Sequence, residues 1–321
     1  MTDKKYSSFS GISTVAYTIV TPNYLAHAWS LKKSFLEHNQ GFRFFICILG
    51  EKDNCPQMST DDVYFISSLE DKRIGEMISR YNPFELSCAL KPFFAYHILE
   101  HHNHVQRLIY LDSDMYVFGA FAVLSDAAIT LSPHRTVNVN YLPGFDNFST
   151  IDLLKYGVYN AGYFELLRKP EALNFIKWWQ ELMVNHAYNK PEENLFTDQL
   201  WLSTVHSFFN DVFINKNPGY NAAFWNLIER KISIANNNYY VNGEPLILFH
   251  YSNYKVEEPE RLVNFEHPML SFASLPELRP VFEKYRKGLL EAGYEKIKKI
   301  PYPFSYKQEP KKKKWWEKIF G

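Results

Sequence analysis

The sequence predicts an α/β protein whose central sheet is mostly parallel and twisted, with helices on both faces. Two observations predict this class. Short apolar, β-branched segments alternate with amphipathic segments through the first 120 residues, which is typical of parallel strands joined by crossover helices. The chain also has 17% aromatic and 22% charged residues, a composition typical of folded globular proteins rather than disordered ones.

The individual elements follow from this alternation of pattern. We expect strands over 14–20, 42–49, 62–67, 107–112, 159–167 and 246–252, and helices over 24–38, 74–100, 171–186 and 275–294. Within the long helical stretch, Pro83 stands near a start and Pro92 predicts a kink. A proline-containing linker is expected over 300–310.

The 321 residues are enough for one large domain with an appendage. We expect a main domain over 1–255, a C-terminal helical extension over 256–310 and a basic amphipathic tail over 311–321. The tail, "KKKKWWEKIFG", would place its Trp, Ile and Phe side chains on one helical face and lysines beside them. Such a segment favours peripheral binding to an anionic membrane surface. A solubilising disordered terminus and a tail docked on its own domain are the alternatives.

Charge and cysteine content exclude several classes. Lys plus Arg and Asp plus Glu both number 35, and residues 296–321 contain nine Lys and two Glu, a net of +7 that leaves −7 on the rest. Because the positive charge is confined to the tail, nucleic acid is not expected as a partner. No signal peptide and no apolar run of about 18 residues is recognisable. Cys47, Cys55 and Cys88 lack metal-type spacing, which favours reduced thiols in a cytoplasmic protein.

Two carboxylates end the strand-like segment in "LIYLDSDMYVFG". Asp112 and Asp114 lie at positions i and i+2, so in an extended segment both can reach one ion. Ligands bind at the carboxyl ends of parallel strands, and oxygen ligands suit Mn²⁺ or Mg²⁺. The pair therefore predicts a divalent cation site. Solvation of both groups, a helix cap, or a pair with Lys or Arg are the alternatives.

Two classes of enzyme place such a pair after a strand. In haloacid-dehalogenase-like phosphatases the motif lies near the N-terminus and a later Gly-Asp pair supplies metal ligands. Here more than a hundred residues precede the motif, and the chain contains no Gly-Asp dipeptide. A nucleotidylyltransferase would need a Gly-rich loop after the first strand, and "TPNYLAHAW" is not one.

The second class fits the order and spacing of several motifs between residues 13 and 255. These motifs are "YTIVTPNYLAHAWSLKKSF", "ELSCALKPFFAYHIL", "VQRLIYLDSDMYVFG", "YNAGYFELL", "TDQLWL", "NPGYNAAFWN" and "LILFHYSN". The sequence resembles glycosyltransferase family 8 and its bacterial relatives, which have the GT-A fold. The resemblance implies a GT-A architecture with a C-terminal helical extension, and a nucleotide-sugar donor.

The resemblance also implies roles for individual residues. Asp112, Asp114 and His250 would bind Mn²⁺ (or Mg²⁺), with Ser113 against the ribose. The turn with Val20, Thr21 and Tyr24 would hold the nucleobase, although Thr21 stands where the family often has an acidic residue. Lys91 would lie near the donor sugar, Asn160, Ala161 and Gly162 beneath it, and Lys255 near the diphosphate. Asp198 and Gln199 would flank the anomeric carbon as the catalytic pair.

The sequence therefore predicts a metal-dependent hexosyltransferase. It would use a nucleotide-diphosphate sugar, with UDP-sugar expected, and retain anomeric configuration. The acceptor, a glycan, a lipid-linked molecule or a protein, is left open, and residues 120–158 and 215–245 are expected to shape its site. A protein of the same fold that binds nucleotide sugars or glycans without turnover is the first alternative, and the phosphatase is the second.

Overall fold

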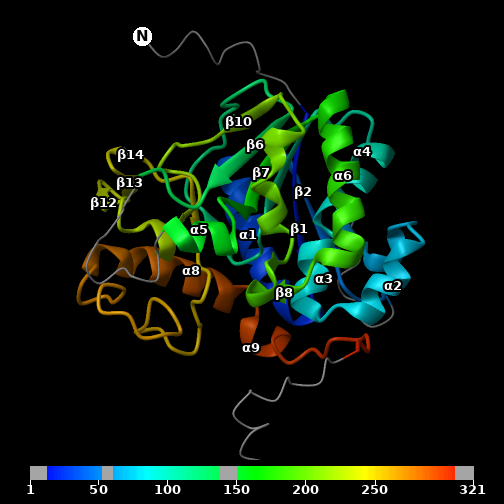
Figure 1. Ribbon diagram of the computed structural model, residues 1–321. Helices are drawn as coiled ribbons and strands as arrows, with labels where there is room; N and C mark the ends of the chain where they lie inside the picture. The colour runs from blue at the N-terminus through cyan, green and yellow to red at the C-terminus, as the bar shows by residue number, and fades with distance from the viewer. Residues whose placement is uncertain (1–12, 53–60, 138–149, 308–321) are drawn as a thin grey trace, which may run out of the picture.

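The computed structural model describes residues 13–52, 61–137 and 150–307 (Figure 1). Cys55 and the predicted tail over 311–321 lie outside these residues. Seven strands form the central sheet in the order β10-β6-β7-β4-β1-β2-β3. Their bounds are β1 Thr14–Val20, β2 Arg43–Ile48, β3 Val63–Phe65, β4 Arg107–Leu111, β6 Ile129–Pro133, β7 Tyr159–Leu167 and β10 Val212–Ile214.

The predicted mostly parallel sheet is confirmed. Strand β1 pairs in parallel with β2 and β4, β2 with β3, and β6 with β10. Strand β7 runs antiparallel to both of its neighbours, β4 and β6. All seven residues of β1 are buried, which is why its sequence, TVAYTIV, does not alternate between apolar and charged residues.

Helices cover both faces of the sheet, as predicted (Figure 1). On one face α1 (Leu25–His38) packs with α8 (Arg279–Glu291) and α9 (Tyr294–Ile297); on the other lie α2 (Arg73–Arg80), α3 (Pro83–Ala89), α4 (Lys91–His101) and α6 (Pro170–His186). Alternate residues of β1 serve the two layers: Tyr17 joins the apolar cluster under α4 and α6, whereas Ala16 joins the one under α1.

The expected helix over 74–100 is wrong as a single kinked element, because three helices occupy this stretch. Asn82 begins α3: its side chain accepts hydrogen bonds from the backbone of Phe84 and Glu85, and the Glu85 carboxylate accepts one from Asn82. This reciprocal capping box, with Pro83 in the first turn, starts a new helix. Pro92 likewise lies in the first turn of α4 rather than at a kink.

Smaller elements complete the described chain. They are β5 Met115–Val117, α5 Thr150–Tyr156, β8 Asn189–Lys190, β9 Leu195–Phe196, α7 Gln199–Leu202, β11 Ala222–Ala223, β12 Ile232–Ala235, β13 Asn238–Val241, β14 Glu244–Pro245 and β15 Leu248–His250. The predicted helix over 275–294 and strand over 246–252 are therefore longer than the observed α8 and β15. In the described ranges, no helix combines the length and apolar character that a membrane span requires.

The order of the strands places a crevice at the centre of the sheet. From β1 the chain moves outward through β2 and β3, then returns to the other side of β1 as β4. Such a reversal between neighbouring parallel strands is a topological switch point, where ligands bind beyond the carboxyl ends of the strands. The turn after β1 and the two carboxylates after β4 therefore lie at the same edge of the sheet.

Candidate active site

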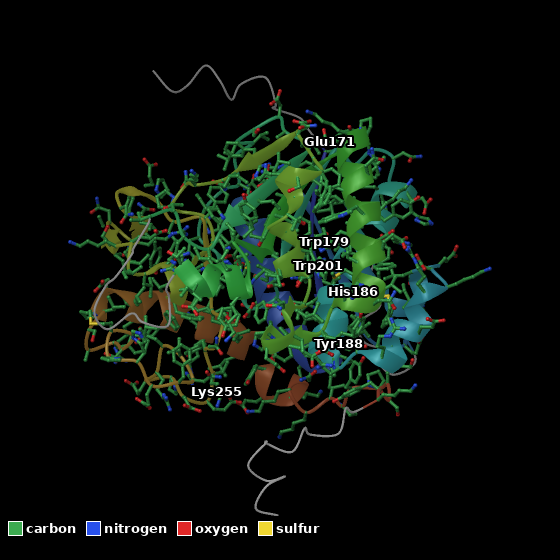
Figure 2. The ribbon with its side chains drawn as sticks, in the orientation of Figure 1. Glu171, Trp179, His186, Tyr188, Trp201 and Lys255 are labelled. Carbon is green, nitrogen blue, oxygen red and sulfur yellow. The ribbon has the colours of Figure 1, made fainter. Side chains whose placement is uncertain are left out.

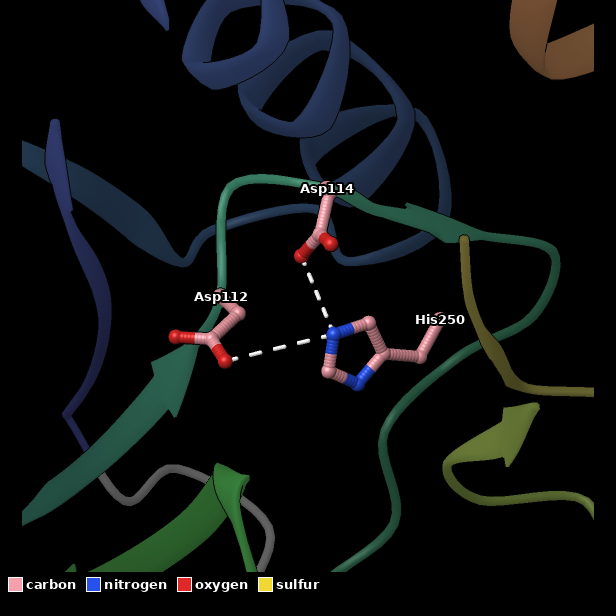
Figure 3. Close-up of side chains that lie close together, drawn as sticks. All are labelled: Asp112, Asp114 and His250. Atoms are coloured by element: carbon pink, nitrogen blue, oxygen red, sulfur yellow. Dashed lines mark ion pairs between the residues drawn. The ribbon is translucent and has the colours of Figure 1, made fainter. Parts of the chain in front are cut away.

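Three ligand-type side chains meet at the carboxyl end of β4 (Figure 3). Asp112 and Asp114 follow β4, and β5 then pairs antiparallel with β15 so that His250 lies opposite Met115. His250 Nε2 is 3.0 Å from Asp114 Oδ1 and 3.9 Å from Asp112 Oδ2. One ligand atom from each residue lies within 4.8 Å of the others. The register of β5 against β15 thus brings together the three predicted metal ligands, which are up to 138 residues apart in sequence (250 − 112).

The donor set fits a divalent cation. Two carboxylate oxygens and one imidazole nitrogen suit Mn²⁺ or Mg²⁺ and leave positions for further oxygen ligands. The side chains of Asp112 and Asp114 are 29% and 32% exposed, so they face the opening of the site, whereas that of His250 is 5% exposed. Asn221 Oδ1 lies 3.3 Å from His250 Nδ1, which orients the ring so that Nε2 faces the carboxylates.

The charges of this cluster shift the pKa values of its members. Burial alone would lower the pKa of His250, but Asp114 and Asp112 raise it above its usual value. Burial would raise the pKa of Asp114, yet His250 lowers it. Without a cation, the protein thus stabilises an imidazolium–carboxylate pair. A cation bound between these groups would replace the proton on Nε2.

Lys91 forms the inner wall of the site. Its ammonium lies 3.1 Å from Asp112 Oδ1 and 2.9 Å from Asp198 Oδ2, and it donates to the Ala161 carbonyl over 3.0 Å. Burial would lower its pKa, but Asp112 and Asp198 raise it, so Lys91 is a cation here. Asp112 and Asp198 share this one lysine, and Asp114 pairs with the His250 imidazole, so three carboxylates face two cationic partners. The cluster therefore has an excess of negative charge that a divalent cation would balance.

The opposite wall is a hydrogen-bonded network without charge. Gln199 Oε1 accepts hydrogen bonds from the Asn160 amide (2.9 Å) and from the Ala161 backbone (3.1 Å). Asn160 Oδ1 accepts from Gly162 N and from Asn221 Nδ2. The amide side chains are thus fixed in orientation, as a preorganised polar surface requires.

Gly162 provides the space for the cation ligands. A Cβ atom at this position would lie 2.7 Å from Asp112 Oδ2, 2.7 Å from His250 Cε1 and 2.8 Å from Asn160 Oδ1. All three distances are shorter than nonbonded contacts allow. The glycine of the "YNAGYF" segment is therefore required by close packing around the cation site.

These side chains line a cavity of about 790 Å³, within the size range of small-molecule sites. One end is formed by Val20, Thr21 and Tyr24 from the turn after β1, together with Ile300 and Tyr302. The Tyr24 ring is stacked on His27, with ring centroids 4.6 Å apart. Burial first, then Asp114, raises the pKa of Tyr24.

The structure brings together most of the predicted site residues. The cavity is lined by Val20, Thr21, Tyr24, Lys91, Asp112, Ser113, Asp114, Asn160, Asp198, Gln199 and His250. Ala161 and Gly162 lie directly behind it, bonded to Gln199 and Asn160. Lys255 is not among the lining residues: its side chain is half-exposed, and its ammonium lies 3.2 Å from the Glu258 carboxylate. Figure 2 shows Lys255 well apart from Trp179, whose indole donates to the Asp198 carbonyl. The role of Lys255 at the diphosphate remains a prediction.

Three residues at the site were not singled out from the sequence. Tyr110 donates to Asp112 Oδ1 over 2.6 Å, and Trp225 packs edge-on against His250 with centroids 5.0 Å apart. Asn221 bridges His250 and Asn160 with a φ of +54°. Asn adopts this left-handed conformation more readily than most residues. All three residues lie within quoted motifs, but only the fold shows what they contact.

No family model matches this chain. Two curated proteins of Bacillus subtilis (strain 168) are similar to it, and both are named only as uncharacterized. YfnF is 25% identical over 255 residues, 76% of this chain and 82% of that protein. YfnD is 22% identical over 247 residues, 74% and 76% of the two chains.

Three glycosyltransferases of known structure are similar to this chain. The galactosyltransferase LgtC, in complex with donor and acceptor sugar analogs, is 14% identical with a TM-score of 0.47 over 85% of this chain and 95% of its own. The bifunctional WbbM is 13% identical with a TM-score of 0.49 over 90% and 52%. A glycosyltransferase involved in the glycosylation of the major capsid of PBCV-1 is 12% identical with a TM-score of 0.43 over 76% of this chain and 94% of its own. Similarity at this level does not transfer an activity, a donor or a metal to this chain.

Proposed function

We propose that the protein is a divalent-cation-dependent glycosyltransferase that moves a hexose from a nucleoside diphosphate sugar to an acceptor hydroxyl. The observation that carries the proposal is the convergence of Asp112, Asp114 and His250 at the switch point of the sheet, facing the cavity. A bound Mn²⁺ or Mg²⁺ would neutralise the diphosphate as it leaves. The described residues have the donor atoms for such a cation.

The chain's own residues divide the cavity by chemistry. The exposed ring of Tyr24, beyond the cation cluster, suits a nucleobase because aromatic side chains stack on bases, and Val20, Thr21 and Ser113 would hold the base and ribose. Lys91 and Asp198 form a polar recess behind Asp112 that suits sugar hydroxyls. Such a division matches the elongated shape of a nucleotide sugar.

Asp198 and Gln199 would flank the anomeric carbon, and we propose that the configuration is retained. Burial raises the pKa of Asp198, against the opposing effect of Lys91. The ion pair with Lys91 fixes the position of the Asp198 carboxylate. From this position the carboxylate would accept hydrogen bonds from a sugar. The fixed carbonyl oxygen of Gln199 can oppose positive charge that develops on the sugar ring.

A nucleotide-sugar panel tests this function. The protein is incubated with UDP-, GDP- and ADP-hexoses and Mn²⁺, with and without a chelator, and release of nucleoside diphosphate is measured. Cation-dependent release that rises with added acceptor is expected, and the anomeric configuration of the product is read by NMR. Nucleotide-sugar binding without any turnover would instead indicate a binding protein, and activity only on phosphate monoesters would indicate a phosphatase.

A further inference from the structure

A row of aromatic side chains lines one end of the cavity. The Trp225 ring lies against the cation ligand His250, with centroids 5.0 Å apart. Phe224 contacts Trp225 over 5.1 Å, and Phe265 contacts Phe224 over 5.6 Å between centroids. All three side chains line the cavity and are partly exposed to solvent. The indole N–H of Trp225 is buried, so this residue offers its ring and no donor. We call Phe224, Trp225 and Phe265 the aromatic wall.

The order of the strands places the aromatic wall across the cation site from Tyr24. Trp225 also packs against His134, with centroids 5.5 Å apart, and His134 directly follows β6. In the sheet, β6 and β7 lie on one side of β4, whereas β1 and the turn with Tyr24 lie on the other. Because two of the cation ligands follow β4, the wall and Tyr24 lie on opposite sides of the cation site.

The two sequence ranges predicted to shape the acceptor site, 120–158 and 215–245, both line this end of the cavity. The second range supplies two of the three rings of the wall, and the first supplies Tyr156. Gln199 Nε2 donates to the Tyr156 carbonyl over 2.8 Å, so this end adjoins the side chain that we place at the anomeric carbon. A molecule bound against the wall would therefore reach that carbon.

Polar side chains lie beside the rings. Arg135 follows His134 and lines the cavity together with Asp152. Ser252 and Asn253 line it where the chain leaves β15. This end of the cavity thus combines flat apolar surfaces with charged and neutral hydrogen-bonding groups, as small-molecule sites commonly do.

We propose that the acceptor is a pyranose sugar whose C–H face stacks on the aromatic wall. This inference rests on the proposed function. The C–H groups on one face of a pyranose carry a small positive charge that suits the negative face of an aromatic ring, and the hydroxyl groups on its rim suit the polar neighbours. A lipid chain has no hydrogen-bonding group, and a serine or threonine side chain has one hydroxyl and no such face.

The aromatic wall would hold the acceptor for attack on the donor. One hydroxyl oxygen of the acceptor sugar would bond to the anomeric carbon while the bond from that carbon to the diphosphate oxygen breaks. The proton of that hydroxyl would leave with the diphosphate. The rings themselves take no part in these bond changes, so their loss should affect acceptor binding first.

Replacing a ring with leucine tests the stacking, because leucine keeps an apolar contact and loses the flat face. Phe224→Leu and Phe265→Leu are made, and Trp225 is kept because it contacts His250. The probes are methyl glucosides, methyl galactosides and N-acetylglucosamine, added to the preferred nucleotide sugar and Mn²⁺. We expect at least one sugar to accelerate release of nucleoside diphosphate, and its KM to rise roughly 3- to 10-fold in each variant. The affinity for nucleoside diphosphate with Mn²⁺, measured by calorimetry, should stay the same.

A matched control and a second measurement isolate the stacking. Phe208→Leu makes the same change at a 61% exposed phenylalanine that does not line the cavity, and it should leave KM for the sugar unchanged. Saturation-transfer NMR with Mg²⁺, which is not paramagnetic, should show the strongest transfer to the C–H protons on one face of the bound sugar. This measurement on wild type tests the inference even if a variant does not fold.

The outcomes separate this inference from the function on which it rests. If wild type neither binds a nucleoside diphosphate nor turns over any nucleotide sugar, the proposed function fails and this inference fails with it. If the donor is turned over but only a polyprenyl phosphate or a peptide accelerates it, or no sugar does, this inference alone is overturned. Equal KM for the sugar in wild type and both leucine variants would overturn it as well, because the rings would then contribute no stacking.

Discussion

Strands β4 and β7 carry charged side chains at both ends, and the two ends are built in opposite ways. At one end Arg107 and Glu165 form an ion pair of 2.7 Å, with side chains 0% and 8% exposed. Tyr163 donates to Glu165 and the guanidinium also donates to the Ala122 carbonyl. One positive charge meets one negative charge, and the pair is closed inside the core.

The other end is open. Asp112 and Asp114 are about one third exposed, and the three carboxylates of Asp112, Asp114 and Asp198 have two cationic partners, Lys91 and His250. Removing either partner of a buried, balanced and hydrogen-bonded ion pair strongly destabilises the fold. A cluster with excess negative charge at a cavity can instead be neutralised by a bound cation. The difference teaches that charge balance, and not charge itself, separates the structural end of these strands from the functional one.

Asp112→Asn should give the largest effect, because it removes a cation ligand and leaves the fold intact. We expect turnover to fall by roughly 10³-fold, a loss of several kcal/mol of transition-state stabilisation. Calorimetry with Mn²⁺ and nucleoside diphosphate should show a parallel loss of binding. The free energy of unfolding should change by no more than about 1 kcal/mol, because Lys91 keeps Asp198 and the Ala161 carbonyl as partners. Full activity in this variant would show that the cluster binds no catalytic cation.

Arg107→Met tests the closed end. The substitution leaves the Glu165 carboxylate buried without its partner, so we expect a loss of about 3–5 kcal/mol in the free energy of unfolding, measured with urea. Adding Glu165→Gln to the same chain should recover part of this loss. Cation affinity of the folded fraction should stay at the wild-type value. A drop in cation affinity without a drop in the free energy of unfolding would contradict the assignment of Arg107 to a purely structural role.

Gly162→Ala should weaken cation binding at the open end, because the new methyl group crowds the ligands. The new methyl group would lie 2.7 Å from Asp112 Oδ2 and from His250 Cε1, so both ligands must shift, and we expect cation affinity to fall about 10- to 100-fold, as when ligand orientation is lost. Gly75→Ala is the matched control, because no atom lies within 4 Å of its Cβ position on α2. This control should stabilise the helix by about 0.5–1 kcal/mol without changing cation affinity.

The sequence predicts those parts of the open end that depend on local pattern. An apolar strand that feeds into Asp112 and Asp114 locates one half of the site, and Gly162 follows from its motif. The contact of His250 with these carboxylates depends on the register of β5 against β15, which is a long-range property. The division of 74–100 into three helices does not follow from hydrophobic periodicity, because it depends on the capping contacts of Asn82. Tyr302 carries no motif, and only its packing brings it to the cavity.

The smallest expected effect is a loss of stability in acid near Tyr24, at the turn after β1. His27 lies between the rings of Tyr24 and Tyr294, and burial lowers its pKa to about 4, below the unfolded value of about 6.5. The stability from neutral His27 is therefore fully present above pH 6.5 and is lost as the pH falls toward 4. The guanidinium of Arg107 keeps its charge over this range, so the closed end should not contribute.

Urea unfolding at pH 7.5 and pH 5.0 measures this loss. We expect His27 to account for about 1 kcal/mol of the decrease, a value reduced for its partial exposure. His27→Gln should lose correspondingly less stability between the two pH values, whereas His104→Gln, at an exposed position, should behave as wild type. An equal decrease in wild type and His27→Gln would mean that His27 is already protonated at neutral pH or has a partner when charged. In that case the acid sensitivity of the open end would have to come from other groups.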